Sequence, residues 1–232
     1  MTFTHGLAEF AASAHTAPPS RLGTRYDTTR FLPEAGNTVV CHLDLDAPGH
    51  EPVLEARARM QALPGAGNFL FTPIPSLHMT VFEGALETRR RPDAWPAWAA
   101  LDAPMDDVTQ AQLPRLQGFR APPPFSVEVV DLKPTGLQLA GASDADETAL
   151  RRWREALTAP FGYRHADHDA YVFHMSFAYP LAWLPDDLLP HWQQGCDAIL
   201  ADLRQAAPVI PLTRPAFCRF PDMTLFEELL LL

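Results

Sequence analysis

Two short segments of the chain each place a histidine two residues before a hydroxyl side chain, inside an apolar run. His78 and Thr80 lie in Leu-His-Met-Thr-Val-Phe, and His174 and Ser176 lie in Phe-His-Met-Ser-Phe. Because side chains alternate along a β-strand, each His and its hydroxyl share one face while the apolar neighbours share the other. Two such strands side by side would offer two imidazoles for proton transfer and two hydroxyl donors. Acid–base chemistry at phosphorus needs these groups.

The repetition of the motif makes it informative. A single His-x-Thr/Ser is typical of an ordinary half-buried strand whose histidine bonds a backbone carbonyl. Here the two copies share their apolar flanks and a central methionine, and His78 and His174 are 96 residues apart. This spacing is expected of a duplicated structural unit. The two segments therefore predict one site built from two related halves.

The paired motifs resemble the signature of the 2H phosphoesterases, a superfamily that includes 2′-5′ RNA ligase-like proteins and cyclic nucleotide phosphodiesterases. The segments 36–43 and 78–84 are further similar to a bacterial and fungal branch that lacks an assigned substrate. The resemblance extends from about residue 36 to the C-terminus. It implies opening of a 2′,3′-cyclic phosphate, or cleavage or ligation of a 2′,5′ linkage, which is chemistry of RNA processing.

In the implied reaction one histidine removes a proton from the attacking water or hydroxyl, and the other protonates the departing ribose oxygen. Histidine suits both roles because its ordinary pKa lets the neutral and protonated forms coexist near neutral pH. Thr80 and Ser176 would donate hydrogen bonds to the non-bridging phosphate oxygens. The sequence leaves open which of His78 and His174 is the base. This chemistry needs no metal, and we expect no cofactor.

Other residues are candidates for binding the substrate: Phe82, Arg89, Arg90, Arg91, His42, Tyr171 and Tyr179. If the alternation continues, Phe82 shares the face of His78 and forms an apolar wall of the cleft. The three consecutive arginines could bind a second phosphate, although such runs are usually solvated. His42 could line the cleft or be structural. Each tyrosine could stack on a base, bond a phosphate or pack in the core.

The segment around His165, His168 and Asp169 invites a metal interpretation, because imidazoles and carboxylates three or four residues apart are common ligands. It falls in a predicted loop, where no helix fixes the ligand geometry. The sequence contains no P-loop, no dinucleotide-binding fingerprint and no Gly-x-Ser-x-Gly elbow. It therefore offers no support for an ATPase, a dinucleotide enzyme or a serine hydrolase.

Composition limits the class of ligand. The chain has 232 residues, 47% of them hydrophobic, and a formal net charge of −10, with 18 basic residues against 28 acidic ones. Proteins that track long nucleic acids gain affinity by neutralising many phosphates with Lys and Arg. We therefore expect a small nucleotide or a short RNA end as ligand, and no long nucleic acid. No protein partner is predicted.

The sequence also bears on the compartment. No apolar run approaches the roughly 20 residues of a membrane span, and the N-terminal residues lack the basic and apolar regions of a signal peptide. We therefore expect a cytoplasmic protein without membrane association. Cys41, Cys196 and Cys218 are odd in number and far apart, which predicts buried thiols rather than disulfides or a zinc site.

The elements that must position the motifs follow one order in both halves, namely strand, helix and motif strand. Strands are expected at 38–45, 68–72, 77–83, 126–133, 135–140, 171–179 and 209–212. Helices are expected at 52–63, 105–113, 143–160 and 185–205. Residues 223–232 could form a strand or a short helix.

These elements predict an α+β fold with two pseudo-symmetric lobes, each a mainly antiparallel sheet backed by helices, and a cleft between them. Residues 1–35 would form an N-terminal arm that packs loosely or covers the cleft. Residues 36–232 would form the two-lobed domain, with approximate halves 36–124 and 125–232. The same fold could also serve as a nucleotide-binding module without turnover. The intact pairs of histidine and hydroxyl favour an enzyme, because binding alone needs no matched acid and base.

Overall fold

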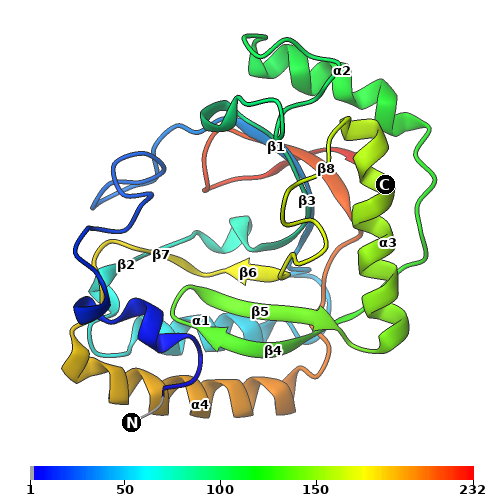
Figure 1. Cartoon of the computed structure of the whole chain (residues 1–232). Helices are drawn as coiled ribbons and strands as arrows, with labels where there is room; N and C mark the ends of the chain where they lie inside the picture. The colour runs from blue at the N-terminus through cyan, green and yellow to red at the C-terminus, as the bar shows by residue number, and fades with distance from the viewer. Residues whose placement is uncertain (1–2) are drawn as a thin grey trace.

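The computed structural model describes residues 3–232, which form four α-helices and two β-sheets (Figure 1). The helices are α1 (Glu51–Gln61), α2 (Met105–Gln117), α3 (Asp144–Phe161) and α4 (Leu189–Ala206). The strands are β1 (Gly36–His42), β2 (Phe69–Phe71), β3 (His78–Leu86), β4 (Val127–Lys133), β5 (Gly136–Gly141), β6 (His174–Ser176), β7 (Ala178–Pro180), β8 (Ala216–Phe220) and β9 (Glu227–Leu231).

The main sheet has seven strands in the order β4-β5-β6-β3-β1-β8-β9, and each neighbouring pair is antiparallel. A small second sheet pairs β2 with β7. The predicted α+β class with a mainly antiparallel sheet is confirmed. The segments 36–124 and 125–232 share one continuous sheet, because β8 and β9 from the C-terminal segment pair beside β1 from the first.

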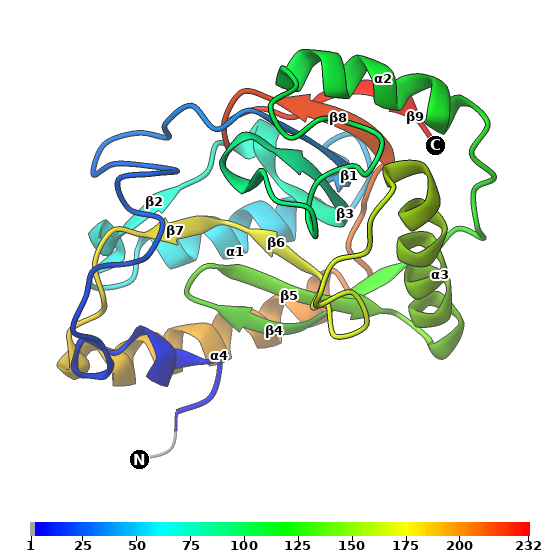
Figure 2. The ribbon, with the colours of Figure 1, turned by 45° about the horizontal axis from the view of Figure 1, so that its top comes forward.

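The two motif strands, β3 and β6, are neighbours near the middle of the main sheet (Figure 2). β1 flanks β3 on one side, and β5 flanks β6 on the other. This arrangement reflects the strand, helix and motif-strand order of each half. The two motifs are therefore adjacent in the sheet although they are far apart in the sequence.

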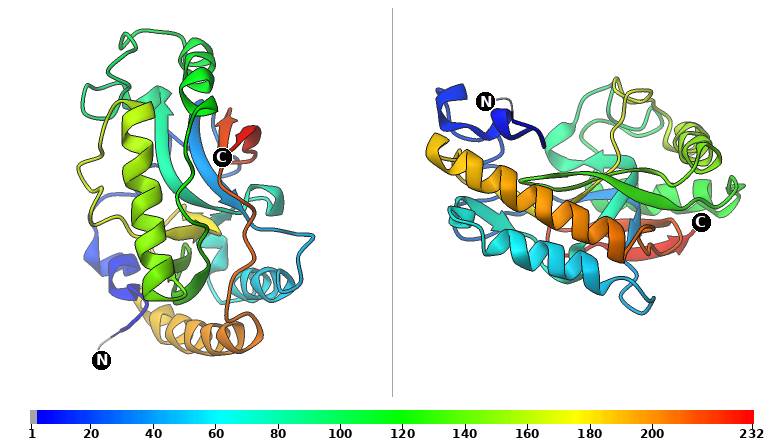
Figure 3. Two further views of the ribbon diagram at one scale, coloured as in Figure 1. Left: turned by 90° about the vertical axis from the view of Figure 1, so that its right-hand side faces the viewer. Right: turned by 90° about the horizontal axis from the view of Figure 1, so that it is seen from below.

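The helices pack on the side of the sheet that carries the apolar residues of the motifs. Met79 and Met175 are fully buried in a core that also contains Leu157 of α3 and Cys196 of α4. Helices α1 and α4 lie side by side (Figure 3). All three cysteines are buried free thiols, as predicted. The opposite face of β3 and β6 is left for the motif histidines and hydroxyls.

Local sequence explains where α3 begins and ends. The Ser143 hydroxyl accepts a hydrogen bond from the Asp146 backbone N–H (3.2 Å) and donates to the Asp146 carboxylate (2.5 Å). This reciprocal cap satisfies backbone groups that the first turn leaves free. Gly162 follows the helix with a left-handed backbone (φ 78°), which glycine adopts without strain. The predicted helix at 143–160 is confirmed.

Three predicted elements differ from the structure. Helix α2 continues through Pro114 to Gln117 instead of ending at residue 113. Residues 209–212 form only isolated bridges, because Pro208, Pro211 and Pro215 interrupt the segment and lack a backbone N–H. The expected strand at 171–179 divides at residue 177 into β6 and β7, which belong to different sheets. The C-terminal segment forms a strand, β9.

The N-terminal arm is packed against the body of the protein. Leu7 and Tyr26 are almost completely buried. The Ala12 backbone N–H donates to the Leu184 carbonyl (2.8 Å), and the Leu184 N–H donates to the Phe10 carbonyl (2.8 Å). The arm therefore has a defined path along the edge of the small sheet (Figure 1). Within residues 3–232, no helix combines the length and the apolarity needed to cross a bilayer.

Candidate active site

The register of β3 against β6 brings the two motifs together. Met79 pairs with Met175 in this antiparallel ladder. Continuing that register sets His78 opposite Ser176 and Thr80 opposite His174. Because the two methionines point into the core, all four motif side chains project from the other face. Each histidine thus lies across from the hydroxyl of the other motif.

Both histidines make a hydrogen bond through Nδ1 to a nearby backbone carbonyl. The His78 Nδ1 lies 2.7 Å from the Ser76 carbonyl oxygen, and the His174 Nδ1 lies 3.0 Å from the Val172 carbonyl oxygen. A carbonyl can only accept, so Nδ1 carries the proton in each ring. When either ring is neutral, its Nε2 therefore holds a free lone pair.

The two imidazoles have different surroundings. His78 is half-buried, and burial lowers its pKa to about 4, helped by the neighbouring imidazoles of His42 and His174. Its ring centroid lies 4.0 Å from that of Phe226, which excludes water on one side. His174 is exposed to solvent. His78 is therefore neutral near neutral pH, with its Nε2 free to accept a proton.

A cavity of about 140 Å³ opens over the four motif residues. Its charged lining is Arg21, Arg25, Glu83 and Arg89, and its apolar wall is Leu86, Phe220, Met223 and Phe226. The two arginines of the N-terminal arm and the aromatic residues Phe220, at the end of β8, and Phe226, after it, were not predicted from the sequence. They lie far from the motifs along the chain and carry no local pattern, so only the tertiary structure brings them to the site.

Arg89 is the member of the arginine run that lines the cavity. Its Nη1 lies 2.7 Å from the Glu83 carboxylate, and its Nη2 donates to the Gly84 carbonyl (2.9 Å). Burial alone would raise the pKa of Glu83, but the Arg89 charge and hydrogen bond outweigh it and hold that pKa below its usual value. Glu83 therefore stays ionised and keeps Arg89 in place.

The other two arginines of the run do not line the cavity. Arg90 pairs with Glu87, donates to the carbonyls of Leu101 and Ala103, and lies over the Trp95 ring. Arg91 is exposed and pairs with Asp93 instead. Of the three arginines proposed to bind a phosphate, only Arg89 therefore lies at the motif cavity. Their side chains organise the loop that follows β3.

The expected position of Phe82 on the face of His78 is wrong. Val81 is an extra residue in β3, because Thr80 and Phe82 pair with consecutive residues of β1. Such a bulge reverses the alternation of side chains beyond it. Phe82 therefore points into the core, fully buried, with its ring 4.8 Å from that of Phe161. Glu83 takes the position on the cavity face that the sequence assigned to Phe82.

The remaining candidates are His42 and the two tyrosines. His42 pairs with His78 across β1 and β3, but its Nδ1 contacts Glu228 (3.2 Å) and it does not line the cavity. Tyr171 and Tyr179 both line it. Burial raises the pKa of each tyrosine, so both hydroxyls stay protonated and can donate. The Tyr171 hydroxyl is buried without a hydrogen-bond partner among the described residues.

The histidines considered as metal ligands bind other parts of the chain. The His165 Nε2 lies 2.8 Å from the Glu83 carbonyl, and the His168 Nε2 lies 3.2 Å from Glu155. Their rings pack around Phe82. Over residues 3–232, no group of three or more His, Cys, Asp or Glu side chains has an arrangement suited to a metal ion. These residues therefore act as packing and positioning groups.

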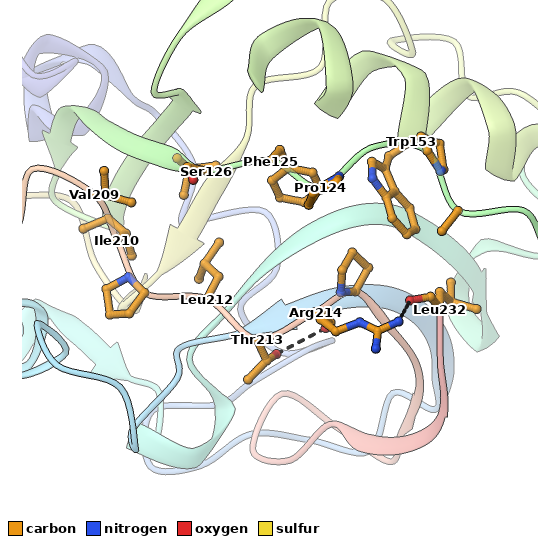
Figure 4. A pocket seen from close by; sticks show the side chains of 15 residues that line it. Pro124, Phe125, Ser126, Trp153, Val209, Ile210, Leu212, Thr213, Arg214 and Leu232 are labelled. Atoms are coloured by element: carbon orange, nitrogen blue, oxygen red, sulfur yellow. Dashed lines mark hydrogen bonds between the residues drawn. The ribbon is translucent and has the colours of Figure 1, made fainter. Parts of the chain in front are cut away.

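Of the larger cavities away from the motifs, two lie against helices of the body. One of about 490 Å³ is bordered by prolines, Phe125, Trp153 and the segment before β8, and Arg214 there donates to the Leu232 backbone oxygen (Figure 4). The other, of about 690 Å³, is a groove along α1 and α4. Neither contains the paired histidines and hydroxyls. Size alone therefore does not identify the site in this protein.

The motif cavity brings together the groups that phosphoester chemistry uses. Two imidazoles can exchange protons with a substrate, two hydroxyls and two tyrosines can donate hydrogen bonds, and three guanidinium groups favour anions. The apolar wall suits the flat face of a base or a ribose. Such a site fits a compact ligand that carries phosphate.

The comparisons with known proteins agree with this geometry. A family model named 2H-phosphodiest, described as a domain of unknown function (DUF1868), matches residues 25–138. A crystal structure of a conserved protein of unknown function, ATU0111, from Agrobacterium tumefaciens str. C58 superposes with a TM-score of 0.96. That protein is 41% identical in sequence, and the match covers 98% of this chain and 99% of that one.

No curated protein matches the chain. The family match includes β1 and the first motif, and the similarity to the Agrobacterium protein covers both motifs. The chain therefore belongs to the 2H phosphoesterase family, whose name indicates a phosphodiesterase type of function.

Proposed function

We propose that the protein is a metal-independent phosphodiesterase that acts on a 2′,3′-cyclic phosphate or a 2′,5′ linkage in a small nucleotide or at an RNA end. The register of β3 and β6 carries this proposal, because it gathers two imidazoles and two hydroxyls over one cavity. The family supports the phosphodiester class. The acidic net charge of −10 supports a small ligand over a long polymer.

For hydrolysis, His78 is the base and His174 the acid. The neutral His78 Nε2 takes a proton from water as the water oxygen forms a bond to phosphorus. The bond from phosphorus to one ribose oxygen breaks, and the protonated His174 Nε2 gives its proton to that oxygen. The product is a ribose phosphate monoester, and solvent exchange restores both rings. The lowered pKa of His78 supports its assignment as the base.

Thr80 and Ser176 stabilise the charge that develops on the non-bridging phosphate oxygens. Their hydroxyls lie on the same face as the imidazoles, one across from each ring. Donors that are already oriented toward this charge lower the barrier more than they stabilise the bound substrate. Tyr171 supplies a further protonated hydroxyl at the same cavity.

The decisive experiment is an assay of the purified protein against 2′,3′-cyclic AMP, a cyclic phosphate of ADP-ribose and a 2′,5′-linked diadenosine, with EDTA present. Turnover of one of these should persist in EDTA, because the proton transfers come from side chains. His78→Ala and His174→Ala should each lower kcat by roughly 10²- to 10⁴-fold. The double variant should lose less than the product of the two, since both groups act in one step.

His191→Ala is the matched control, because His191 is an exposed histidine of α4 outside the cavity. Full activity in either motif variant would overturn the mechanism. Activity that EDTA removes and zinc or manganese restores would overturn the metal-independent reaction. Tight binding of nucleotides without turnover would identify a nucleotide-binding module of the same fold.

A further inference from the structure

The cavity holds more positive charge than the paired motifs account for. Three guanidinium groups line it, from Arg21 and Arg25 of the N-terminal arm and from Arg89 after β3, against two carboxylates, Glu83 in the lining and Glu34 behind Arg25. The protein as a whole has a formal charge of −10. A local excess of cations on an acidic protein favours an anionic ligand at that place.

Arg25 and Arg89 are held so that their charge stays at the cavity. The Arg25 Nε is paired with Glu34, which is 1% exposed and also accepts a hydrogen bond from the Thr88 hydroxyl (2.6 Å). Glu34 thereby ties the arm to the loop that carries Arg89. The Arg89 Nε is buried and has no hydrogen-bond partner among the described residues. Its Nη1 and Nη2 pair with the Glu83 carboxylate and the Gly84 carbonyl, which fixes the guanidinium at the cavity.

The reacting phosphate does not use all of this charge. A cyclic phosphodiester carries one negative charge, and the motif side chains already provide its two hydroxyl donors and a protonated imidazole. A phosphate monoester carries a charge of about −1.5 to −2 at neutral pH, because it ionises much as the phosphate of phosphoserine does. Arginine clusters are a common way to bind such a group.

We propose that Arg21, Arg25 and Arg89 form a second phosphate subsite, and that the substrate is a cyclic-phosphate mononucleotide that also carries a 5′-phosphate. The proposal rests on the proposed function. The N-terminal arm would then determine specificity, while the motif strands perform the reaction. A neighbouring internucleotide phosphate could supply the same chemistry, but it carries one charge and belongs to a polymer that the acidic surface repels.

The test compares kcat/KM for 2′,3′-cyclic AMP, its 5′-phosphorylated form, and an ApA dinucleotide that ends in a 2′,3′-cyclic phosphate. We expect kcat/KM for the 5′-phosphorylated mononucleotide to exceed that for 2′,3′-cyclic AMP by roughly 10- to 100-fold. This is the usual contribution of hydrogen bonds to a charged group. The preference should appear mainly in KM and weaken with salt. A dinucleotide that performs better would identify the RNA end as the source of the phosphate.

Arg21→Ala should reduce this preference, and it should leave the fold intact because Arg21 is exposed. Arg25→Lys keeps a charge beside Glu34 and should retain part of the preference, whereas Arg25→Ala should lose more. Arg30→Ala is the matched control from the same arm, because Arg30 is exposed, pairs with Asp27 and does not line the cavity. Equal kcat/KM for the first two substrates would overturn the subsite. Equal effects of Arg21→Ala and Arg30→Ala would also overturn it.

Binding of products separates this proposal from the proposed function. Adenosine 2′,5′-bisphosphate should bind at least about 10-fold more tightly than adenosine 2′-phosphate by calorimetry, and Arg21→Ala should narrow the ratio. This comparison requires no turnover. A protein that binds adenosine 2′,5′-bisphosphate more tightly but hydrolyses none of the substrates would support the phosphate subsite and contradict the proposed enzymatic function. A protein that hydrolyses 2′,3′-cyclic AMP but shows no preference for the second phosphate would support the proposed enzymatic function and contradict the subsite.

Discussion

The two motif histidines differ in environment although their local sequences are alike. His78 is half-buried beside Phe226 and faces His42, whereas His174 is solvent-exposed at the end of a three-residue strand. Each ring is oriented by a hydrogen bond from Nδ1 to a backbone carbonyl two residues earlier. The orientation of the ring is thus the same in both motifs, whereas the burial of the ring differs. A pair of this kind can divide acid and base roles at one pH.

The pH dependence of kcat/KM should reflect this division. The pKa of His78 is lowered to about 4, so its base form persists as the pH falls and is lost only near pH 4. We expect an acidic limb near that pH and an alkaline limb that depends on the proton donor. His78→Ala should remove the acidic limb and His174→Ala the alkaline one, measured as kcat/KM between pH 3.5 and 9.

The limbs of the wild-type profile belong to the coupled pair, so the single variants make the assignment. An acidic limb that survives in His78→Ala would belong to another group. A rate that stayed constant up to pH 9, with chemistry rate-limiting, would contradict proton donation by a histidine.

The motif hydroxyls should contribute less than the histidines. Thr80→Val and Ser176→Ala each remove one donor to the phosphate and should lower kcat by about 10- to 10³-fold. Thr148→Val on the exposed side of α3 is a control for loss of a threonine hydroxyl. Steady-state kinetics and melting temperatures should be measured together. A change confined to the melting temperature would make the hydroxyls structural.

At the scale of single elements, the bulge in β3 shapes the cavity. Val81 is the extra residue, and its carbonyl accepts a hydrogen bond from the Arg154 Nη1 (2.8 Å). Arg154 is fully buried, and burial lowers the pKa of its guanidinium. The bulge re-aims the strand so that Glu83 reaches the cavity and holds Arg89 there. An irregularity of one residue therefore determines which charge faces the cavity.

Gly84, next to this bulge, should not tolerate a side chain. A Cβ there would lie 2.1 Å from the Asn37 side-chain oxygen and 2.4 Å from its backbone oxygen. Gly84→Ala should therefore lower the free energy of unfolding by about 1–3 kcal/mol. Gly118→Ala is the control, because nothing lies within 4 Å of its Cβ position, and its effect should stay within about 0.5 kcal/mol. Equal unfolding midpoints in denaturant for the two variants would contradict this packing.

Elements whose cause is local were predictable from the sequence. The helix expected at 143–160, which Ser143 caps, and the alternation that places His78 and Thr80 on one face depend on neighbours within a few residues, and both prove correct. The bulge at Val81 could not be predicted, because it depends on the register with β1 rather than on composition. Phe82 was therefore placed on the wrong face. Arg25 was missed for a similar reason, since its position at the cavity depends on a buried contact with Glu34.

At the scale of the whole molecule, the N-terminal arm is fastened far from the cavity that it helps to line. His5 is buried, with its Nδ1 2.6 Å from Asp131 and its Nε2 2.9 Å from Asp197. Burial alone would lower the pKa of His5, but the hydrogen bonds and charges of Asp197 and Asp131 outweigh it and raise that pKa. Only the doubly protonated ring can donate to both carboxylates.

This contact should make arm docking weaker at higher pH. Because the folded pKa of His5 is raised above its usual value, its contribution is complete below about pH 6.5 and is lost as the pH rises through the folded pKa. Hydrogen-exchange protection of the Ala12 amide, which bonds to the Leu184 carbonyl, measures docking after correction for intrinsic exchange.

His5→Gln should abolish this pH dependence of protection, because glutamine does not titrate in this range. His191→Gln, at an exposed position on α4, should leave it unchanged. Protection that is independent of pH in the wild-type protein would show that the arm is held by its apolar contacts alone, with Leu7 as the main one.

The position of β1 between β3 and β8 has a consequence for synthesis of the chain. Gly36 pairs with Phe220 near the C-terminus, so one edge of β1 has no partner until almost the whole chain has been made. At about 5–20 residues per second, the ribosome needs roughly 10–40 s to cover that distance. During this interval the nascent strand exposes the apolar run 39–41 and a row of free peptide groups, which are the features that promote mispairing. We expect the emerging chain to depend on chaperones until its last two strands close the sheet.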